Sequence, residues 1–215
     1  MPFIHNDHYL DLLLRELPTP CRRALDVGCG TGTLARKLAL RGIDVDAVDA
    51  DGAVIAGAQK QTSAIGPPGR LHFQQADITD LALRPDTYDY IACVASIHHV
   101  PFDTVKKLRT ALSANGVLVI LGCYRDSALR DHAMSLLAAP VNAICRTVVF
   151  LREKFSGAPS STNNQHPPAP VASPSMSFTE IRESAAAHLP RSRMRRLLFW
   201  RYLLVFRNSE RTAGQ

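Results

Sequence analysis

Residues 23–49 read RALDVGCGTGTLARKLALRGIDVDAVD, and this stretch carries the clearest structural signal in the chain. It opens with an apolar strand over residues 23–27, followed by a glycine-rich loop. A helix is predicted next over residues 33–41, and a second apolar strand over residues 43–48. A strand, a crossover helix and a further strand are the repeating unit of a parallel α/β sheet.

The loop between the first strand and the helix has the composition of a ligand site. Gly28, Gly30 and Gly32 let the backbone turn sharply and leave room for a ligand to approach. The helix points its free N–H groups at the loop, which favours an electron-rich ligand. Asp49 follows 21 residues after Gly28, at the end of the second strand, where a carboxylate can bind both hydroxyls of a ribose. The unit therefore predicts a nucleoside-cofactor site.

The spacing of the glycines separates cofactor classes. A dinucleotide-binding loop reads G-x-G-x-x-G, whereas residues 28–32 read G-x-G-x-G. Residues 25–32, LDVGCGTG, resemble the first motif of class I S-adenosylmethionine-dependent methyltransferases almost residue for residue. A nicotinamide- or flavin-binding Rossmann domain and a glycine-rich turn without a ligand are the alternatives.

This resemblance implies a fold, a cofactor and a set of binding residues. The fold is α/β: a Rossmann-like, doubly wound, seven-stranded sheet, mostly parallel, with a C-terminal antiparallel hairpin and a helical cap insertion. The cofactor is S-adenosylmethionine, and the product is S-adenosylhomocysteine. The implied cofactor-binding residues are Asp26, Gly28, Cys29, Gly30, Thr31, Gly32, Asp49, Ala50, Asp77, Ile78 and Ser96.

The resemblance assigns different residues of this set to three parts of the cofactor. Asp26 and the glycine loop would hold its amino-acid end, Asp49 its ribose, and Asp77 with the backbone of Ile78 its adenine. Read from the residues alone, Asp77 equally fits the cap of a short turn at residues 79–81, and one aspartate can do both.

Length and composition fit one α/β domain over residues 1–215, with 46% hydrophobic residues. The net charge is +6, and residues 188–211 hold seven arginines and one glutamate. These arginines alternate with apolar residues, which favours a basic strand surface over a nucleic-acid patch. Five widely spaced cysteines without a C-x-x-C pair predict reduced thiols and no metal site. We see no secretory signal and expect a cytoplasmic location.

A second candidate site follows the apolar run at residues 88–94, which predicts a central buried strand. His98 and His99 come next and resemble the corresponding loop of small-molecule methyltransferases. Either imidazole is a candidate catalytic base for an acceptor hydroxyl or amine, and either could instead be a packing residue. No Asn/Asp-Pro-Pro-aromatic motif and no Pro-Cys pair follows this strand, which argues against methylation of nucleic-acid bases.

An amphipathic helix is predicted over residues 5–17. By resemblance it lies over the cofactor cleft, so His5, His8 and Tyr9 are candidate substrate contacts, together with Tyr124 after the fifth strand. The alternative places the two histidines on the surface of a helix whose leucines pack on the sheet.

The remaining pattern predicts helices over residues 51–61, 101–114 and 178–188, and strands over residues 71–76, 117–123, 193–199 and 202–206. Residues 127–155 predict a helical cap, with a membrane-surface or dimer-interface role as the alternative. Residues 156–175 are rich in proline and serine and predict a flexible loop. No membrane-spanning segment is expected, because Pro140, Asn142 and Arg146 interrupt the apolar run.

The function expected from these patterns is methyl transfer from S-adenosylmethionine to an oxygen or nitrogen of a small, partly apolar molecule. Two alternatives stay open. One is an RNA or protein methyltransferase that uses the arginine-rich hairpin, and the other is a cofactor-binding protein without catalysis. A nucleic-acid partner is disfavoured, and the chain is expected to be a monomer or a homodimer.

Overall fold

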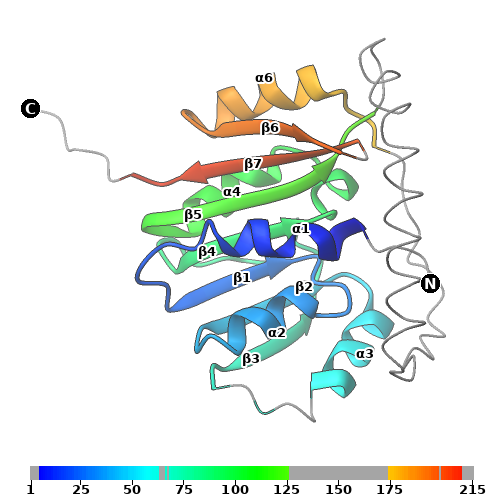
Figure 1. Cartoon of the computed structure of the whole chain (residues 1–215), viewed down its shortest axis with the longest axis vertical. Helices are drawn as coiled ribbons and strands as arrows, with labels where there is room; N and C mark the ends of the chain where they lie inside the picture. Colours follow the sequence, from blue (N-terminus) through cyan, green and yellow to red (C-terminus); the bar gives the residue numbers. More distant parts are fainter. Residues whose placement is uncertain (1–4, 63–65, 67, 126–173, 199, 210–215) are drawn as a thin grey trace, which may run out of the picture.

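The computed structural model describes residues 5–62, 66, 68–125, 174–198 and 200–209. They form a seven-stranded sheet with the order β3-β2-β1-β4-β5-β7-β6 (Figure 1). Strands β1 to β5 pair in parallel, and β7 pairs antiparallel with both β5 and β6. The strands are β1 Arg23–Val27, β2 Asp44–Asp49, β3 Leu71–Gln75, β4 Tyr88–Val94, β5 Leu112–Cys123, β6 Arg193–Leu197 and β7 Arg201–Arg207.

Helices cover both faces of this sheet. Figure 1 shows α1 and α2 in front of the sheet and α4 behind it. The helical elements are α1 His5–Leu14, α2 Thr33–Ala39, α3 Gly52–Thr62, the short 3₁₀ helix η1 Ile97–His99, α4 Thr104–Ala111 and α6 Phe178–His188. The strand order reverses between β1 and β4, which is the position where open α/β sheets bind ligands at the carboxyl ends of their strands.

The two faces of the sheet form two hydrophobic cores. Alternate residues of β1 show this division: Ala24 packs with α1, α2 and α3, while Leu25 packs with α4 and α6. Residues 90–93 of β4 and 117–121 of β5 are fully buried. Continuous burial of central strands requires continuous apolar sequence, which is why β4 and β5 were readable as strands.

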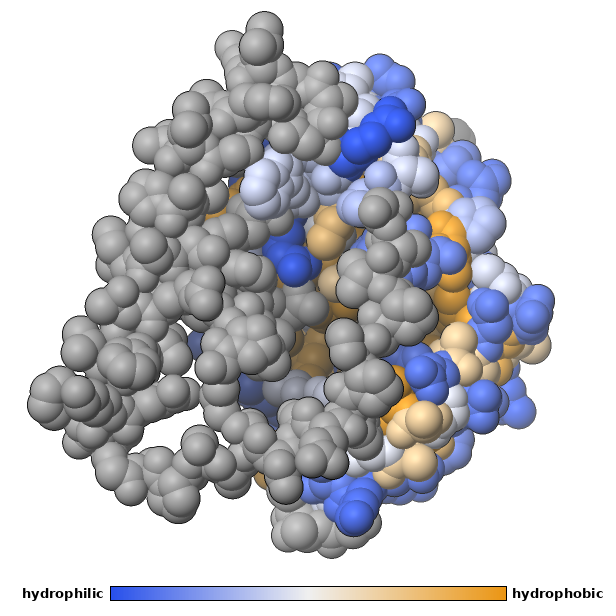
Figure 2. Space-filling view, turned by 90° about the vertical axis from the view of Figure 1, so that its right-hand side faces the viewer, coloured by the Kyte–Doolittle hydropathy of each residue, from blue (hydrophilic) through white to orange (hydrophobic). Residues whose placement is uncertain are grey.

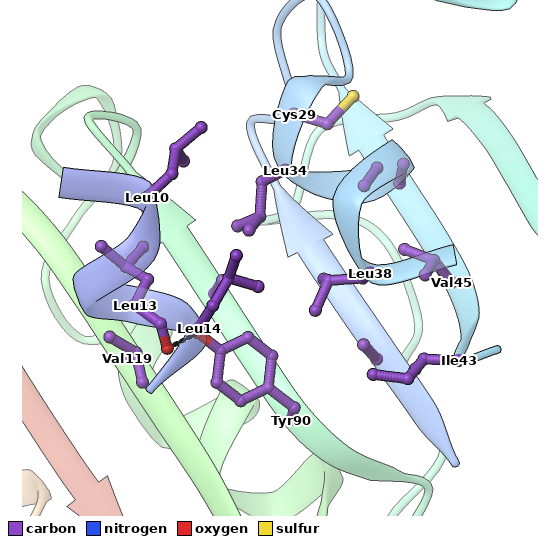
Figure 3. Close-up of a cluster of buried hydrophobic side chains, with 14 of the residues drawn as sticks. Leu10, Leu13, Leu14, Cys29, Leu34, Leu38, Ile43, Val45, Tyr90 and Val119 are labelled. Atoms are coloured by element: carbon purple, nitrogen blue, oxygen red, sulfur yellow. Dashed lines mark hydrogen bonds between the residues drawn. The ribbon is translucent and has the colours of Figure 1, made fainter. Parts of the chain in front are cut away.

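Helix α1 is fixed to the sheet by leucines and by one hydrogen bond. Figure 3 shows Leu14 pointing from α1 toward Leu34 and Leu38 of α2, and Leu13 belongs to the same buried cluster. The hydroxyl of Tyr90 donates a hydrogen bond to the carbonyl of Leu13 at 2.9 Å. The chain before β1 is thereby held over the sheet face that also supports the glycine loop.

The predicted fold class is confirmed, including the C-terminal antiparallel hairpin. Helix α6 begins with a capping box at Ser177. The Ser177 side chain accepts a hydrogen bond from the Glu180 amide at 3.3 Å, and the Glu180 carboxylate accepts one from the Ser177 amide at 2.7 Å. These interactions fix the start of α6.

Several predicted boundaries of helices and strands were wrong. The largest differences lie within residues 101–123. Helix α4 ends at Ala111, three residues before the predicted end, and β5 starts at Leu112 instead of Val117. Leu112 pairs with Tyr88, and the register shifts before Val117 pairs with Tyr90. Asn115, with a φ of 64°, therefore lies in an irregular part of β5 and not between a helix and a strand. Residues 15–17 also lie beyond α1, β6 ends at Leu197, and β7 starts at Arg201.

The predicted cap at residues 127–155 and most of the predicted loop at residues 156–175 lie outside the described residues. Within the described residues, no helix has the length and apolarity needed to cross a bilayer.

Candidate functional site

The glycine loop adopts a backbone that favours glycine at three positions. Gly28, Gly30 and Gly32 have φ values of 67°, 53° and 75°, all in the left-handed region. A Cβ atom at Gly28 would collide with the side chain of Ser96, and one at Gly32 would lie 2.8 Å from the ring of Phe73. A Cβ at Gly30 would meet nothing within 4 Å. The loop therefore packs against the protein at both ends and is open at its centre.

Asp49, at the end of β2, is hydrogen-bonded to that open centre. Its Oδ2 accepts a hydrogen bond from the Gly30 amide at 2.9 Å, and its Oδ1 accepts one from the Asp51 amide at 3.0 Å. The side chain is half-buried. Both oxygens keep a lone pair for a further donor, so the carboxylate is positioned to bind a ligand diol next to the loop.

Asp26, on β1, is a buried carboxyl group with unmet hydrogen-bonding capacity. It is 1% exposed, and neither carboxyl oxygen has a hydrogen-bond partner of good geometry among the described residues. Burial raises the pKa of Asp26 to about 7; the nearby Ala35 amide opposes this rise and the charge of Asp49 adds to it. Such a group is stabilised by a cationic or hydrogen-bond-donating ligand.

Asp77 forms a turn of its own, as the alternative reading predicted. Its Oδ1 accepts hydrogen bonds from the Thr79 amide at 2.8 Å and the Thr79 hydroxyl at 2.7 Å, and these bonds lower the pKa of Asp77. The side chain is exposed. Both hydrogen bonds from Thr79 go to Oδ1, and neither goes to Oδ2. Ile78 beside it is buried, and its carbonyl accepts a hydrogen bond from Lys107 at 2.9 Å.

Three other predicted cofactor residues surround the loop. Ser96 donates a hydrogen bond from its hydroxyl to the carbonyl of Val27 at 2.6 Å, which joins the ends of β1 and β4. Ala50 is exposed directly after Asp49, and Cys29, within the loop, is buried. Arg36, which no sequence pattern identified, donates a hydrogen bond from its guanidinium to the carbonyl of Thr31 at 2.7 Å. Arg36 thereby holds the exposed side of the loop.

The two histidines after β4 have different environments. His98 is half-buried, and its buried Nδ1 has no partner among the described residues. Burial lowers the pKa of His98 to about 4, with smaller contributions from His99 and Arg201, so the ring is neutral at pH 7. His99 is exposed, with its ring centroid 4.1 Å from that of His98. Ala95, with a φ of 53°, turns the backbone into this segment.

His98 lies beside a small apolar pocket at the carboxyl ends of β4 and β5. Its volume is about 30 Å³, enough for a water or a methyl-sized group. Figure 2 views the molecule from this edge of the sheet, where apolar and polar atoms are both visible near the centre. Besides His98, the described residues that line the pocket are Ile97, Val100, Phe102, Cys123, Pro174, Ser175, Met176, Ile181 and Tyr202.

The predicted substrate contacts do not form one group. Tyr9 is buried, and its hydroxyl donates to the carbonyl of Leu198 at 3.4 Å, so it connects α1 to the hairpin. Tyr124 is buried on the other face of the sheet, where its ring packs edge-on against Phe178 at 5.6 Å. For His5 and His8 the structure describes only the backbone, which is part of α1.

Arg201, the first residue of β7, was not identified by any sequence pattern. Its Nη1 donates to the sulfur of Cys123 at 3.3 Å, and its charge acts on both Tyr9 and His98. Within the described residues, no three or more His, Cys, Asp or Glu side chains gather as they would around a metal ion.

Comparison with known proteins identifies the family. The methyltransferase domain family matches residues 24–116, which contain the glycine loop, Asp49 and β4. An uncharacterized methyltransferase of Mycobacterium tuberculosis is 33% identical over 216 residues, covering 96% of this chain and 97% of that protein. The chain belongs to the class I S-adenosylmethionine-dependent methyltransferases.

This methyltransferase also resembles proteins with named reactions. A ubiquinone biosynthesis O-methyltransferase of Chromobacterium violaceum is 33% identical over 136 residues, which are 62% of this chain and 56% of that protein. The magnesium protoporphyrin IX methyltransferase of Synechocystis, solved with bound S-adenosylmethionine, superposes with a TM-score of 0.56 at 16% identity. The superposition covers 95% of this chain and 78% of the Synechocystis protein. At 16% identity it shows that the two proteins share a fold. The cofactor of this methyltransferase is S-adenosylmethionine.

The described residues fit that cofactor. The open space at Gly30, the carboxylate of Asp49 and the unpartnered carboxyl group of Asp26 all lie around the loop after β1. They offer room for a ligand backbone, an acceptor pair for a diol and an acceptor for an ammonium group, which are the features that S-adenosylmethionine presents.

Proposed function

We propose that this methyltransferase transfers a methyl group to an oxygen or nitrogen of a small, partly apolar acceptor. The observation that carries the proposal is the apolar pocket beside the neutral, half-buried His98, at the sheet edge that also bears the glycine loop. The pocket is too small for a whole acceptor and would receive one apolar end of it. The similarity to O-methyltransferases of ubiquinone biosynthesis supports a small acceptor.

The cofactor roles follow the geometry of the loop. Asp26 would accept hydrogen bonds from the ammonium group, with the glycine loop around the amino-acid chain. Asp49 would accept both ribose hydroxyls, because its two oxygens are already oriented by amide donors. Asp77 would use its Oδ2 for the adenine amino group beside the buried Ile78. Ala50 and Ser96 would border the ribose and the loop.

The bound cofactor supplies a methyl group on a positively charged sulfur, which leaves as a neutral thioether. The protein then has two tasks, which are to align the acceptor atom and to remove its proton. His98 is our candidate for the second task because of its position: the half-buried ring lines the pocket, and its Nδ1 has no partner among the described residues. His99 is exposed, and so we assign it no direct role in proton removal.

The experiment that tests this proposal uses S-adenosylmethionine labelled in its methyl group. The full-length protein is incubated with the labelled cofactor and separately with a metabolite extract, total RNA and a protein extract. We expect label in a small organic product and none above background in RNA or protein. Label that accumulates in RNA or protein would refute a small acceptor.

A matched pair of variants tests whether His98 takes part in methyl transfer. We expect His98→Asn to lose most of the transfer to the small product, and Thr110→Ala, on the exposed surface of α4, to keep it. Both variants should retain the thermal stabilisation that S-adenosylhomocysteine gives. Full transfer by His98→Asn would remove His98 from the acceptor site.

A further inference from the structure

Arg201 has hydrogen-bonding capacity that no described residue uses. Its Nη1 donates to the sulfur of Cys123 at 3.3 Å. Its Nε is buried from solvent and has no partner among the described residues. A buried guanidinium N–H without an acceptor is costly, so native structures normally supply one from the protein, from water or from a ligand.

No carboxylate among the described residues forms an ion pair with Arg201. Among the described residues, the charge of Arg201 lowers the pKa values of Tyr9, His98 and Cys123 relative to what burial alone would give, and all three groups are neutral at pH 7 in their ordinary protonation states. Arg207, at the other end of β7, differs in this respect. It is half-exposed and forms a 2.7 Å ion pair with Glu16. No comparable ion pair joins Arg201 to any residue in the described ranges.

Arg201 also lies next to the proposed acceptor pocket. Arg201 is not among the described residues that line the pocket, but it interacts with two that are: the sulfur of Cys123 accepts its hydrogen bond, and its charge helps to lower the pKa of His98. The Nδ1 of His98 is likewise buried and has no partner among the described residues. An apolar pocket with one cation nearby fits a molecule that has an apolar body and one negative charge.

We propose that Arg201 binds a carboxylate group on the methyl acceptor. This inference rests on the proposed function, since it identifies the chemical class of the acceptor at the same site. The Nε–Nη2 edge of a guanidinium binds both oxygens of a carboxylate through two parallel hydrogen bonds, and Nη1 stays on Cys123. The half-buried position of Arg201 strengthens such a pair relative to one in open water.

A carboxylate fits this position better than a phosphate. One guanidinium balances one negative charge, and the described groups whose pKa values it affects, Tyr9, His98 and Cys123, add no second cation at pH 7. A phosphate monoester carries nearly two charges at neutral pH and typically binds several cationic or amide donors.

The test measures binding of matched small molecules to the full-length protein saturated with S-adenosylhomocysteine. The probes are acetate, hexanoate and benzoate, each compared with its neutral amide, and phenyl phosphate. We expect at least one acid to bind about tenfold more tightly than its amide, the effect of one charge-assisted pair. Arg201→Gln should abolish that preference, Arg201→Lys should retain part of it, and Arg207→Gln should leave it intact.

Several outcomes would overturn the proposal. These are equal binding of acids and amides, failure of all three acids to bind, a preference that survives in Arg201→Gln, and tighter binding of phenyl phosphate than of benzoate. The labelled-methyl assay distinguishes an error about Arg201 from an error about the proposed function. A labelled small product without a carboxylate would leave methyl transfer standing and reject the role of Arg201.

Discussion

The backbone amide of Gly30 donates a 2.9 Å hydrogen bond to the carboxylate of Asp49, 19 residues further along the chain. The two residues come from different strand ends, after β1 and at the end of β2, which pair in parallel with Val27 opposite Val48. The Gly28 and Cys29 amides both donate to the Val48 carbonyl, at 2.8 and 3.0 Å, and so fix the same junction. Loop and carboxylate are thus held in place before a ligand binds, which reduces the ordering cost of binding.

The open space at Gly30 gives a direct prediction. Gly30→Ala should weaken binding of S-adenosylmethionine at least tenfold, because the added methyl group points into space that the cofactor would fill. Gly42→Ala is the matched control, since Gly42 also has a positive φ, of 81°, and open space around its Cβ position. Both variants should lose about 1–2 kcal/mol of stability from backbone strain.

Calorimetric titration with S-adenosylmethionine checks this pair. Unchanged affinity in Gly30→Ala, or equal losses of affinity in both variants, would mean that the cofactor does not pass over Gly30.

Asp26 makes the stability of the ligand-free protein depend on pH. Its pKa is about 7 in the folded protein and about 4 in an unfolded chain. Between these values the folded state binds more protons, so the free energy of unfolding falls as the pH rises from about 4 to about 7. Asp26→Asn removes this loss and should be more stable than the wild type at pH 8 by about 2–4 kcal/mol.

Urea denaturation at pH 5 and pH 8 measures the effect. The difference in free energy of unfolding between Asp26→Asn and the wild type should be larger at pH 8 than at pH 5. The variant should also bind S-adenosylmethionine more weakly than the wild type does. A gap that stays constant with pH would show that Asp26 is ionised in the folded protein throughout this range.

We expect substitutions of His98 and His99 to have different effects on kcat. His98→Asn is expected to lower kcat by about 100-fold, the usual size of a lost general base. His99→Asn should change kcat less than threefold, since its side chain is exposed. Because the pKa of His98 is about 4, its ring stays neutral from pH 6 to pH 8 and should add no titration to the kcat profile there.

The checks are initial rates with the labelled acceptor and the binding constant for S-adenosylhomocysteine. That constant should be the same in both histidine variants. A larger kcat loss in His99→Asn than in His98→Asn would exchange the two assignments.

The sequence was sufficient for those parts of the fold that depend on local patterns. The left-handed backbone at Gly28, Gly30 and Gly32 follows from glycine at these positions, and the place of Asp49 follows from the length of one strand–helix–strand unit. The continuous burial of β4 follows from its apolar run. These features are encoded within about 30 neighbouring residues, so the pattern determines them.

Features that depend on distant contacts were not predictable. Residues 112–116 were expected to end a helix and form a turn, and they join the sheet because Leu112 pairs with Tyr88. Arg201 could not be distinguished from the other arginines of the hairpin, since its neighbour Cys123 is 78 residues away in sequence. The burial of Tyr124 opposite α6 likewise depends on Phe178, on an element that follows much later.

The affinity of the Asp49→Ala variant for S-adenosylmethionine is the most direct test of the cofactor site. Relative to the wild type, binding should weaken by about 1.5–3 kcal/mol, the loss of charge-assisted hydrogen bonds to the ribose. Asp44→Ala, at the other end of β2, where the carboxylate pairs with Arg70 at 3.0 Å, should bind as the wild type does. Equal affinity of Asp49→Ala and the wild type, measured by calorimetry, would contradict the assignment of the ribose to Asp49.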